Sequence, residues 1–91
     1  KIYDYMVTLS EQTRNHSMLS LGMSPRGTIA LMEISKAVAF MRERTCVYPE
    51  DVIYAFPFIS RHRIYLTAKA KVENHTKNEV IEEILARVKV R

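Results

Sequence analysis

One arginine stands where the electrostatics of a helix disfavour a cation. Ser24 and Pro25 predict a helix start, because serine caps helix N-termini and proline suits the first helical position. Arg26 then falls in the first turn, at the positive end of the helix dipole, and Gly27 beside it lowers helix propensity. An arginine there could share an anion with backbone N–H groups. A solvated arginine in a loop-to-helix turn is the simpler interpretation, and the residues alone leave both open.

The other reactive side chains form no pattern that catalysis or metal binding requires. The three histidines share no ligand spacing with one another or with Cys46, so we expect neither a metal site nor a Cys–His nucleophile. The acidic pairs at 50–51 and 82–83 are adjacent in helical segments, where neighbouring side chains point in different directions. Two glycines cannot build a phosphate-binding loop. We therefore expect no catalytic residue in this chain, and no nucleotide held by it alone.

The composition describes one small globular domain. A chain of 91 residues has room for a single core, which excludes a multi-domain enzyme. The net charge of +4 is spread along the chain and interrupted by acids, so nucleic acid is not indicated as a partner. The lone Cys46 is expected to act as a small apolar residue in a reducing cytoplasm. No apolar run approaches the roughly 20 residues that span a bilayer, so we expect no membrane segment.

Four amphipathic or capped segments predict helices that would position Arg26. The first covers residues 1 to about 14, and the second runs from Pro25 to about residue 42. The second is apolar on nearly its whole circumference, which is typical of the buried centre of a small bundle. A third helix begins at Pro49, with a kink or break expected at Pro57.

The remaining segments predict a last helix and a minimal sheet. Thr76 and Glu79 have the spacing of a capping box, so the last helix is expected to start there. Residues 64–67 look extended and could pair with residues 46–48, while residues 68–75 appear only as a polar stretch. The prediction is an all-α fold: a small four-helix bundle with room for a minimal two-strand patch. Since the chain starts inside a helical pattern without Met, we expect it to be a piece of a longer protein.

The order of these motifs resembles the C-terminal lid domain of MoxR-type AAA+ ATPases. The resemblance covers nearly the whole chain, from about Ile2 to Val90, and its specific part is the Gly-x-Ser-Pro-Arg stretch. It rests on these segments: Leu-Gly-Met-Ser-Pro-Arg-Gly at 21–27, Val-Tyr-Pro-Glu-Asp-Val at 47–52, Phe-Pro at 56–57, His-Arg at 62–63, and the closing segment 84–88. In this family the arginine of the Ser-Pro-Arg motif is the second-sensor arginine, which reaches the phosphates of ATP. The resemblance places Arg26 in that role, on a helix start formed by Ser24, Pro25 and Gly27.

What the resemblance implies goes well beyond this chain. Residues 1–91 would be a single lid domain that closes over a nucleotide held by an ATPase core, expected N-terminal to residue 1. Binding and hydrolysis of ATP, with Mg²⁺, would be coupled through Arg26 to lid movement. The intact protein would be a cytoplasmic, ring-shaped, hexameric and chaperone-like remodelling machine, with von Willebrand A-domain proteins among its clients. Two residues depart from the usual pattern of the family: Tyr48 stands where a capping residue is usual, and Met23 where a small residue is usual. No chemical role is assigned to Arg63.

Two alternatives stay open at this point. One is a stand-alone helical module that binds an acidic partner or nucleic acid through its basic residues, for which binding should weaken steeply with salt. The other is the lid of a related AAA+ branch, such as the magnesium-chelatase type. A Walker A motif upstream of residue 1 would identify the ATPase class.

Overall fold

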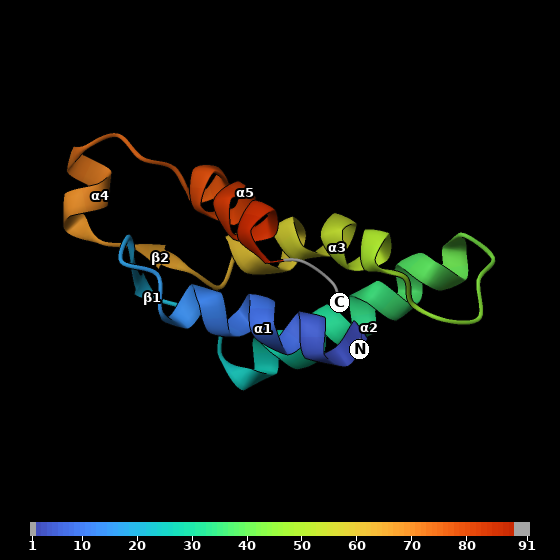
Figure 1. The fold of residues 1–91 in the computed structure, drawn as a ribbon. Coiled ribbons are helices and arrows are strands. Elements are labelled where there is room, and N and C mark those ends of the chain that lie inside the picture. Colours follow the sequence, from blue (N-terminus) through green and yellow to red (C-terminus); the bar gives the residue numbers. More distant parts are fainter. Residues whose placement is uncertain (1, 89–91) are drawn as a thin grey trace.

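The chain forms a small helical domain with a minimal sheet, as predicted. The computed structural model describes residues 2–88; residue 1, where the first helix was expected to begin, and residues 89–91, which include Val90 at the end of the resemblance, lie outside the described residues. The elements are α1 (Ile2–Arg14), β1 (Leu19–Leu21), α2 (Pro25–Met41), α3 (Pro49–Arg61), β2 (Tyr65–Leu66), α4 (Ala68–Val72) and α5 (Lys77–Arg87) (Figure 1). The all-α class and the two-strand patch are confirmed, while the predicted number of helices was one too low because α4 was missed.

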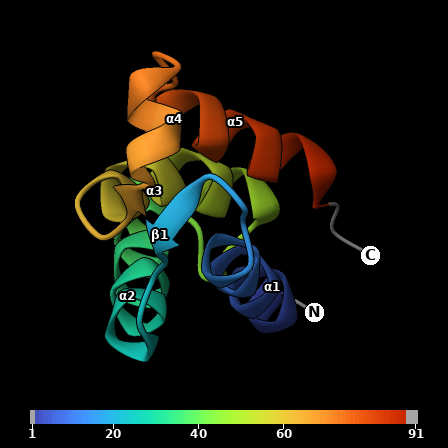
Figure 2. The ribbon, with the colours of Figure 1, turned by 90° about the vertical axis from the view of Figure 1, so that its left-hand side faces the viewer.

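The core lies between α1, α3 and α5, and the apolar stripes read from the sequence point into it. On α1 the buried residues are Tyr5, Met6, Leu9, Ser10 and Thr13. On α5 they are Val80, Ile81 and Ile84. The end view in Figure 2 shows α5 lying across α3, with α1 and α2 on the other side of α3. Spacing of three and four residues therefore identified the inward faces of both terminal helices.

The second helix is not the buried centre of the bundle, contrary to the prediction. It packs chiefly against α3 and also against α1. Its outer face keeps large apolar side chains exposed: Ile29 53%, Ile34 40%, Phe40 79% and Met41 81%. The sequence showed that α2 is apolar all round, but the number of neighbouring helices decides which of its faces is buried.

Helix α3 continues through Pro57, so the predicted break was wrong, while the alternative of a kink stays a prediction. Pro57 removes the N–H that would bond the carbonyl of Ile53, one turn earlier. Ile53 is exposed, so water can satisfy that carbonyl. Phe56 and Ser60, on either side of the proline, are fully buried and hold both halves of the helix against the core.

The sheet forms with a different partner from the one predicted. Strand β2 pairs antiparallel with β1, with Leu19 opposite Leu66 and Leu21 opposite Tyr65. The expected partner, residues 46–48, connects α2 to α3 at the far end of the molecule (Figure 1). The length of α3 separates that connector from β2, because 13 residues of helix span about 20 Å.

The short helix α4 lay in the segment that was expected to be only polar. Thr67 caps it, accepting a hydrogen bond of 3.1 Å from the Ala70 N–H. Asn74 ends the turn with φ of 63°, a left-handed conformation that asparagine tolerates. A helix of five residues is too short to show periodicity, so its cap was its only signal in the sequence.

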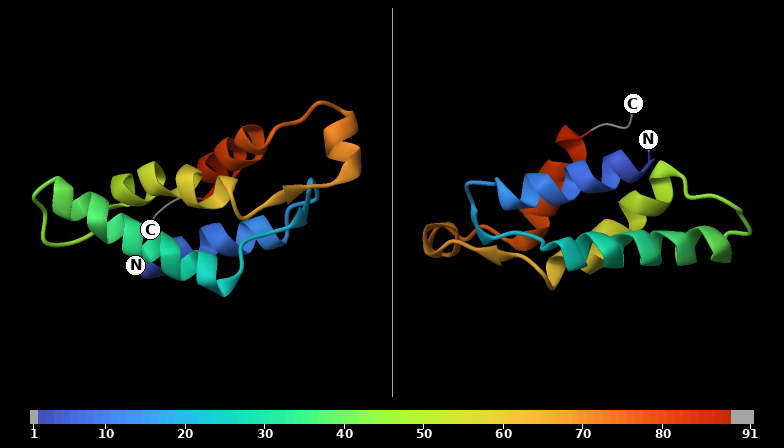
Figure 3. Two further views of the ribbon diagram at one scale, coloured as in Figure 1. Left: turned by 180° about the vertical axis from the view of Figure 1, so that it is seen from behind. Right: turned by 90° about the horizontal axis from the view of Figure 1, so that it is seen from below.

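The molecule is elongated, with principal extents of 44 × 23 × 20 Å. One end holds β1, β2 and α4, and the other holds the α2–α3 connector, as the two views of Figure 3 show. No helix in residues 2–88 is long and apolar enough to cross a membrane.

Candidate functional site: the turn before helix α2

The predicted helix start is present, and its cap is built as expected. Ser24 is the N-cap in extended conformation; its carbonyl accepts the Gly27 N–H at 2.9 Å, and its hydroxyl lies 3.4 Å from the same nitrogen. Pro25 occupies the first helical position. These contacts confirm the local structure predicted for the Ser-Pro-Arg-Gly segment and fix the backbone from which the Arg26 side chain leaves.

The turn is anchored to the end of α1 by Gly22 and Met23. The Met23 N–H donates to Thr13 Oγ1 at 2.8 Å, and Arg14 Nε donates to the Met23 carbonyl at 2.7 Å. A Cβ on Gly22 would lie 2.5 Å from the Thr13 carbonyl carbon, so only glycine allows this close approach. Met23 itself is fully buried, which explains the large residue at this position: its side chain is part of the core.

Arg26 is exposed and carries no compensating charge. The first turn of α2 contains no acidic residue. Across residues 2–88, Arg26 makes no ion pair and no side-chain hydrogen bond. A cation at a helix N-terminus without an acidic neighbour is unfavourable by a few tenths of a kcal/mol or more. The turn therefore presents a guanidinium and the positive end of a helix to solvent.

Two further arginines approach the same turn. The Arg63 side chain lies over Gly27, since a Cβ at position 27 would be 3.1 Å from Arg63 Cδ. Arg14 reaches the turn through its bond to the Met23 carbonyl. The tertiary structure thus brings Arg14, Arg26 and Arg63 together from α1, α2 and the end of α3, and none of them forms an ion pair within the described part of the chain.

Close packing also explains why residue 27 is glycine. The prediction treated Gly27 as a loss of helix propensity, and the structure shows it buried beneath Arg63 and beside Met23, whose Cε would be 3.3 Å from an added Cβ. A larger side chain would displace one of these neighbours.

The other end of α2 holds arginines of a different kind. Asp51 is fully buried, and its Oδ1 accepts hydrogen bonds from Arg42 at 3.0 Å and Arg44 at 2.9 Å. Its Oδ2 accepts the Tyr48 N–H at 2.9 Å, which caps α3 in place of the missing side-chain cap at Tyr48. Burial alone would raise the pKa of Asp51, but the Tyr48 N–H and the positive charges of Arg44 and Arg42 outweigh it and lower the pKa. Through these bonds, Asp51 links both ends of the connector between α2 and α3.

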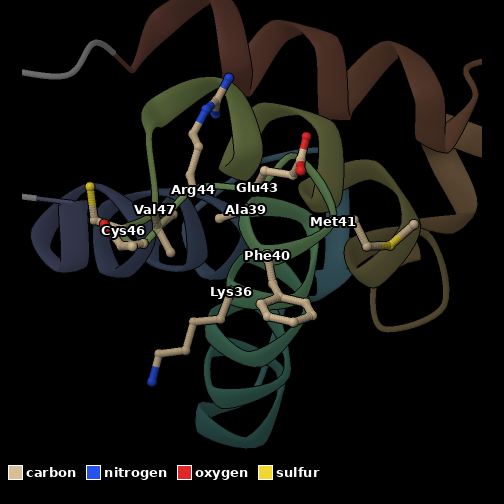
Figure 4. A pocket seen from close by; sticks show the side chains of 9 residues that line it. Lys36, Ala39, Phe40, Met41, Glu43, Arg44, Cys46 and Val47 are labelled. Atoms are coloured by element: carbon tan, nitrogen blue, oxygen red, sulfur yellow. The ribbon is translucent and has the colours of Figure 1, made fainter.

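An apolar groove lies beside that connector, remote from Arg26. It is lined by the last turns of α2, including Lys36 and Phe40, and by residues 43–47 (Figure 4). Cys46, expected to pack as a small apolar residue, is exposed at its edge instead. Glu43 turns the chain here with φ of 59°, which lets the Arg44 N–H reach the Ala39 carbonyl at 3.0 Å.

Two of the three histidines, His16 and His75, pair with carboxylates. His16 Nε2 lies 2.9 Å from Glu83, and His75 Nδ1 lies 3.0 Å from Glu79. The hydrogen bond from His75 lowers the pKa of Glu79. In the described residues, no group of three or more His, Cys, Asp or Glu side chains is arranged to hold a metal ion.

Comparison with known proteins decides the family. Residues 11–84 match the model of the AAA lid domain. The chain belongs to this family, as a lid of the MoxR type of AAA+ ATPase. It is 40% identical over 89 residues to the uncharacterized protein YeaC of Bacillus subtilis, covering 98% of the chain and 28% of that relative. It is 30% identical over 96 residues to the chaperone MoxR1 of Mycobacterium tuberculosis, covering 96% of the chain and 26% of that relative.

A solved structure shares the fold of this lid. The crystal structure of a presumed ATPase from Cytophaga hutchinsonii superposes with a TM-score of 0.93 at 31% identity, over 99% of the chain and 30% of that protein. The lid therefore spans between a quarter and a third of the length of these relatives. The resemblance read from the sequence is confirmed at the level of the family and the fold.

Sequence reasoning did not predict that Arg14 and Arg63 lie beside the turn that carries Arg26. In the sequence Arg63 belongs to the His-Arg pair, to which no chemistry is assigned, and Arg14 lies at the end of the first expected helix. The signal available for Arg63 was indirect: Gly27 inside a helical first turn indicates close approach by another group. Which group approaches depends on the antiparallel packing of α3 against α2, which local sequence does not encode.

Proposed function

We propose that this lid closes over ATP held by an ATPase core, and that Arg26 is the second-sensor arginine that contacts the phosphates. The observation that carries the proposal is an exposed Arg26, unpaired within residues 2–88, on a capped helix start whose first turn has no acidic residue. Arginine suits phosphate because its planar guanidinium donates several hydrogen bonds to neighbouring oxygens. The family membership supplies the nucleotide-binding context.

The proposed mechanism is a coupling of nucleotide state to lid position. The Ser24 cap and the Met23–Thr13 hydrogen bond tie Arg26 to α1, so the turn moves with the whole lid. A guanidinium that binds the terminal phosphate tightly favours the closed position of the lid, and loss of that phosphate removes the preference. The chain's own contribution is thus to orient one cation and to transmit its movement to the domain.

The remaining parts of the machine are proposals that follow from the same family. The ATPase core would precede residue 1. It would hold Mg²⁺ with the nucleotide, because the first turn of α2 carries a cation suited to phosphate oxygens and offers no carboxylate for a metal. The intact protein would form a hexameric ring in the cytoplasm and remodel partner proteins, with von Willebrand A-domain proteins as candidate clients.

The test is Arg26→Ala in the intact ATPase that carries this lid. A charged hydrogen bond is worth about 1.5–3 kcal/mol, so ATP turnover should fall about tenfold or more. The matched control is Lys36→Ala, which removes an exposed cation from the same helix far from the turn. Turnover within twofold of the unaltered enzyme in Arg26→Ala would refute the role of Arg26.

A further inference from the structure

We infer that Arg63 is a second phosphate-binding residue, acting beside Arg26 on the same nucleotide. This inference rests on the proposed function, because it takes the phosphates of ATP as the ligand of the turn. It assigns a role to a side chain that follows α3, some forty residues further along the chain.

The position of Arg63 is set by its backbone and by its stem. The Arg63 N–H donates to the Ser60 carbonyl at 2.9 Å, and the next residue, Ile64, is fully buried. The stem crosses Gly27 so closely that a Cβ at position 27 would lie 3.1 Å from Arg63 Cδ, a contact that would make the stem shift. Because Cδ is bonded directly to the guanidinium nitrogen Nε, the charged group of Arg63 leaves its stem beside Gly27, the residue that follows Arg26.

The guanidinium of Arg63 has no interaction partner within the described residues. Arg63 is exposed, and residues 2–88 provide its side chain with neither an ion pair nor a hydrogen bond. Arg42 and Arg44 show that this fold pairs an arginine with a buried carboxylate where the arginine is structural. Arg63 lies beside the turn that carries Arg26, so a polyanion such as a triphosphate can accept hydrogen bonds from both arginines.

A purely structural role is the competing explanation, because the stem of Arg63 also covers Gly27 and Met23. Methionine keeps an apolar stem of similar length and removes the charge. Arg63→Met therefore separates packing from phosphate binding. Arg61→Met is the matched control, since Arg61 is an exposed arginine at the end of α3 and makes no ion pair in residues 2–88.

The experiment measures kcat and KM for hydrolysis of Mg·ATP by the intact ATPase carrying each variant. We expect Arg63→Met to raise the KM for ATP about tenfold, Arg63→Lys to recover part of the loss, and Arg61→Met to stay within twofold. A KM unchanged in Arg63→Met overturns the inference. If Arg63→Met is normal but Arg26→Ala is impaired, this inference fails and the proposed function of Arg26 stands. If Arg26→Ala is normal but Arg63→Met is impaired, the proposed role of Arg26 fails and that of Arg63 stands.

A second readout uses the contact with Gly27. In the unaltered background, Gly27→Ala should raise the KM for ATP, because the new Cβ pushes the Arg63 stem away, although alanine favours the helix. In the Arg63→Ala background the same substitution should leave the KM unchanged. Equal effects of Gly27→Ala in both backgrounds would show that the glycine acts through its contact with Met23 instead of Arg63, and would count against the inference.

Discussion

The two ends of helix α2 use the same residue type in opposite ways. At its C-terminal end, Arg42 and Arg44 donate to the fully buried Asp51 at 3.0 and 2.9 Å. At its N-terminal end, Arg26 and Arg63 are exposed, and no carboxylate from residues 2–88 pairs with them. The charges at one end are satisfied inside the fold, and those at the other end remain available to a ligand.

The surroundings of each pair account for the difference. The connector between α2 and α3 must reverse the chain, and Asp51 closes it by bonding both arginines and the Tyr48 N–H. Arg42 and Arg44 also lie over aromatic rings, 5.3 Å from the Tyr54 centroid and 4.5 Å from that of Tyr48. The turn at 22–27 is already held by the bonds of Met23 to Thr13 and Arg14 and by the close contacts of its glycines, so the charges of Arg26 and Arg63 are not required to hold it together.

Removal of Asp51 should produce the largest loss of stability. Asp51→Ala leaves two arginines beside an empty buried site and uncaps α3, so we expect the free energy of unfolding to fall by about 3–5 kcal/mol. Urea unfolding followed by circular dichroism measures this change. Glu50→Ala is the control, since its exposed pairing with Arg44 is worth about 1 kcal/mol at most. Equal losses in the two variants would contradict the contrast between the ends of α2.

Low pH should also lower the free energy of unfolding through Asp51, by a smaller amount than the removal of its side chain. The pKa of Asp51 is lower in the folded protein than the ordinary value of about 3.9, so the folded state binds its proton less readily than the unfolded state does. Its contribution to stability is therefore complete above about pH 4 and is lost as the pH falls through the lowered pKa.

The check on this pH dependence is a comparison of unfolding free energies from pH 7 to pH 3. The decrease below pH 4 should be shallower in Asp51→Asn than in the unaltered chain, because asparagine does not titrate. Identical slopes would show that Asp51 contributes nothing to acid sensitivity.

The N-terminal end of α2 should show the smallest change in stability. Arg26→Ala removes a cation that opposes the helix dipole, and its side chain makes no bond in residues 2–88. We expect the free energy of unfolding to change by about 0.5 kcal/mol or less, with a slight gain favoured. Differential scanning calorimetry provides the measurement. A loss above 2 kcal/mol would mean that Arg26 is structural, and the two ends of α2 would no longer differ in kind.

Much of the fold could be predicted because its signals are local. Periodicity located α1 and α5 and their buried faces, and Ser24, Thr76 and the Pro49 start marked helix boundaries that the structure contains. The errors concerned partners: β2 pairs with β1 instead of residues 46–48, α2 is a flank instead of a centre, and Pro57 lies within an intact helix. Each of these depends on which segments meet in space.

The sequence by itself determined the helix start at Ser24, the place of Arg26 in its first turn, and the family motif around it, because capping and dipole effects act over a few neighbouring residues. The tertiary structure alone decided that Arg63 reaches Gly27 and that Arg42 and Arg44 share Asp51. Those contacts arise from the antiparallel packing of α2 on α3, which brings the start of one helix beside the end of the other. Whether a surface arginine is paired or left unpaired therefore follows from packing between helices, which the order of residues along one helix does not specify.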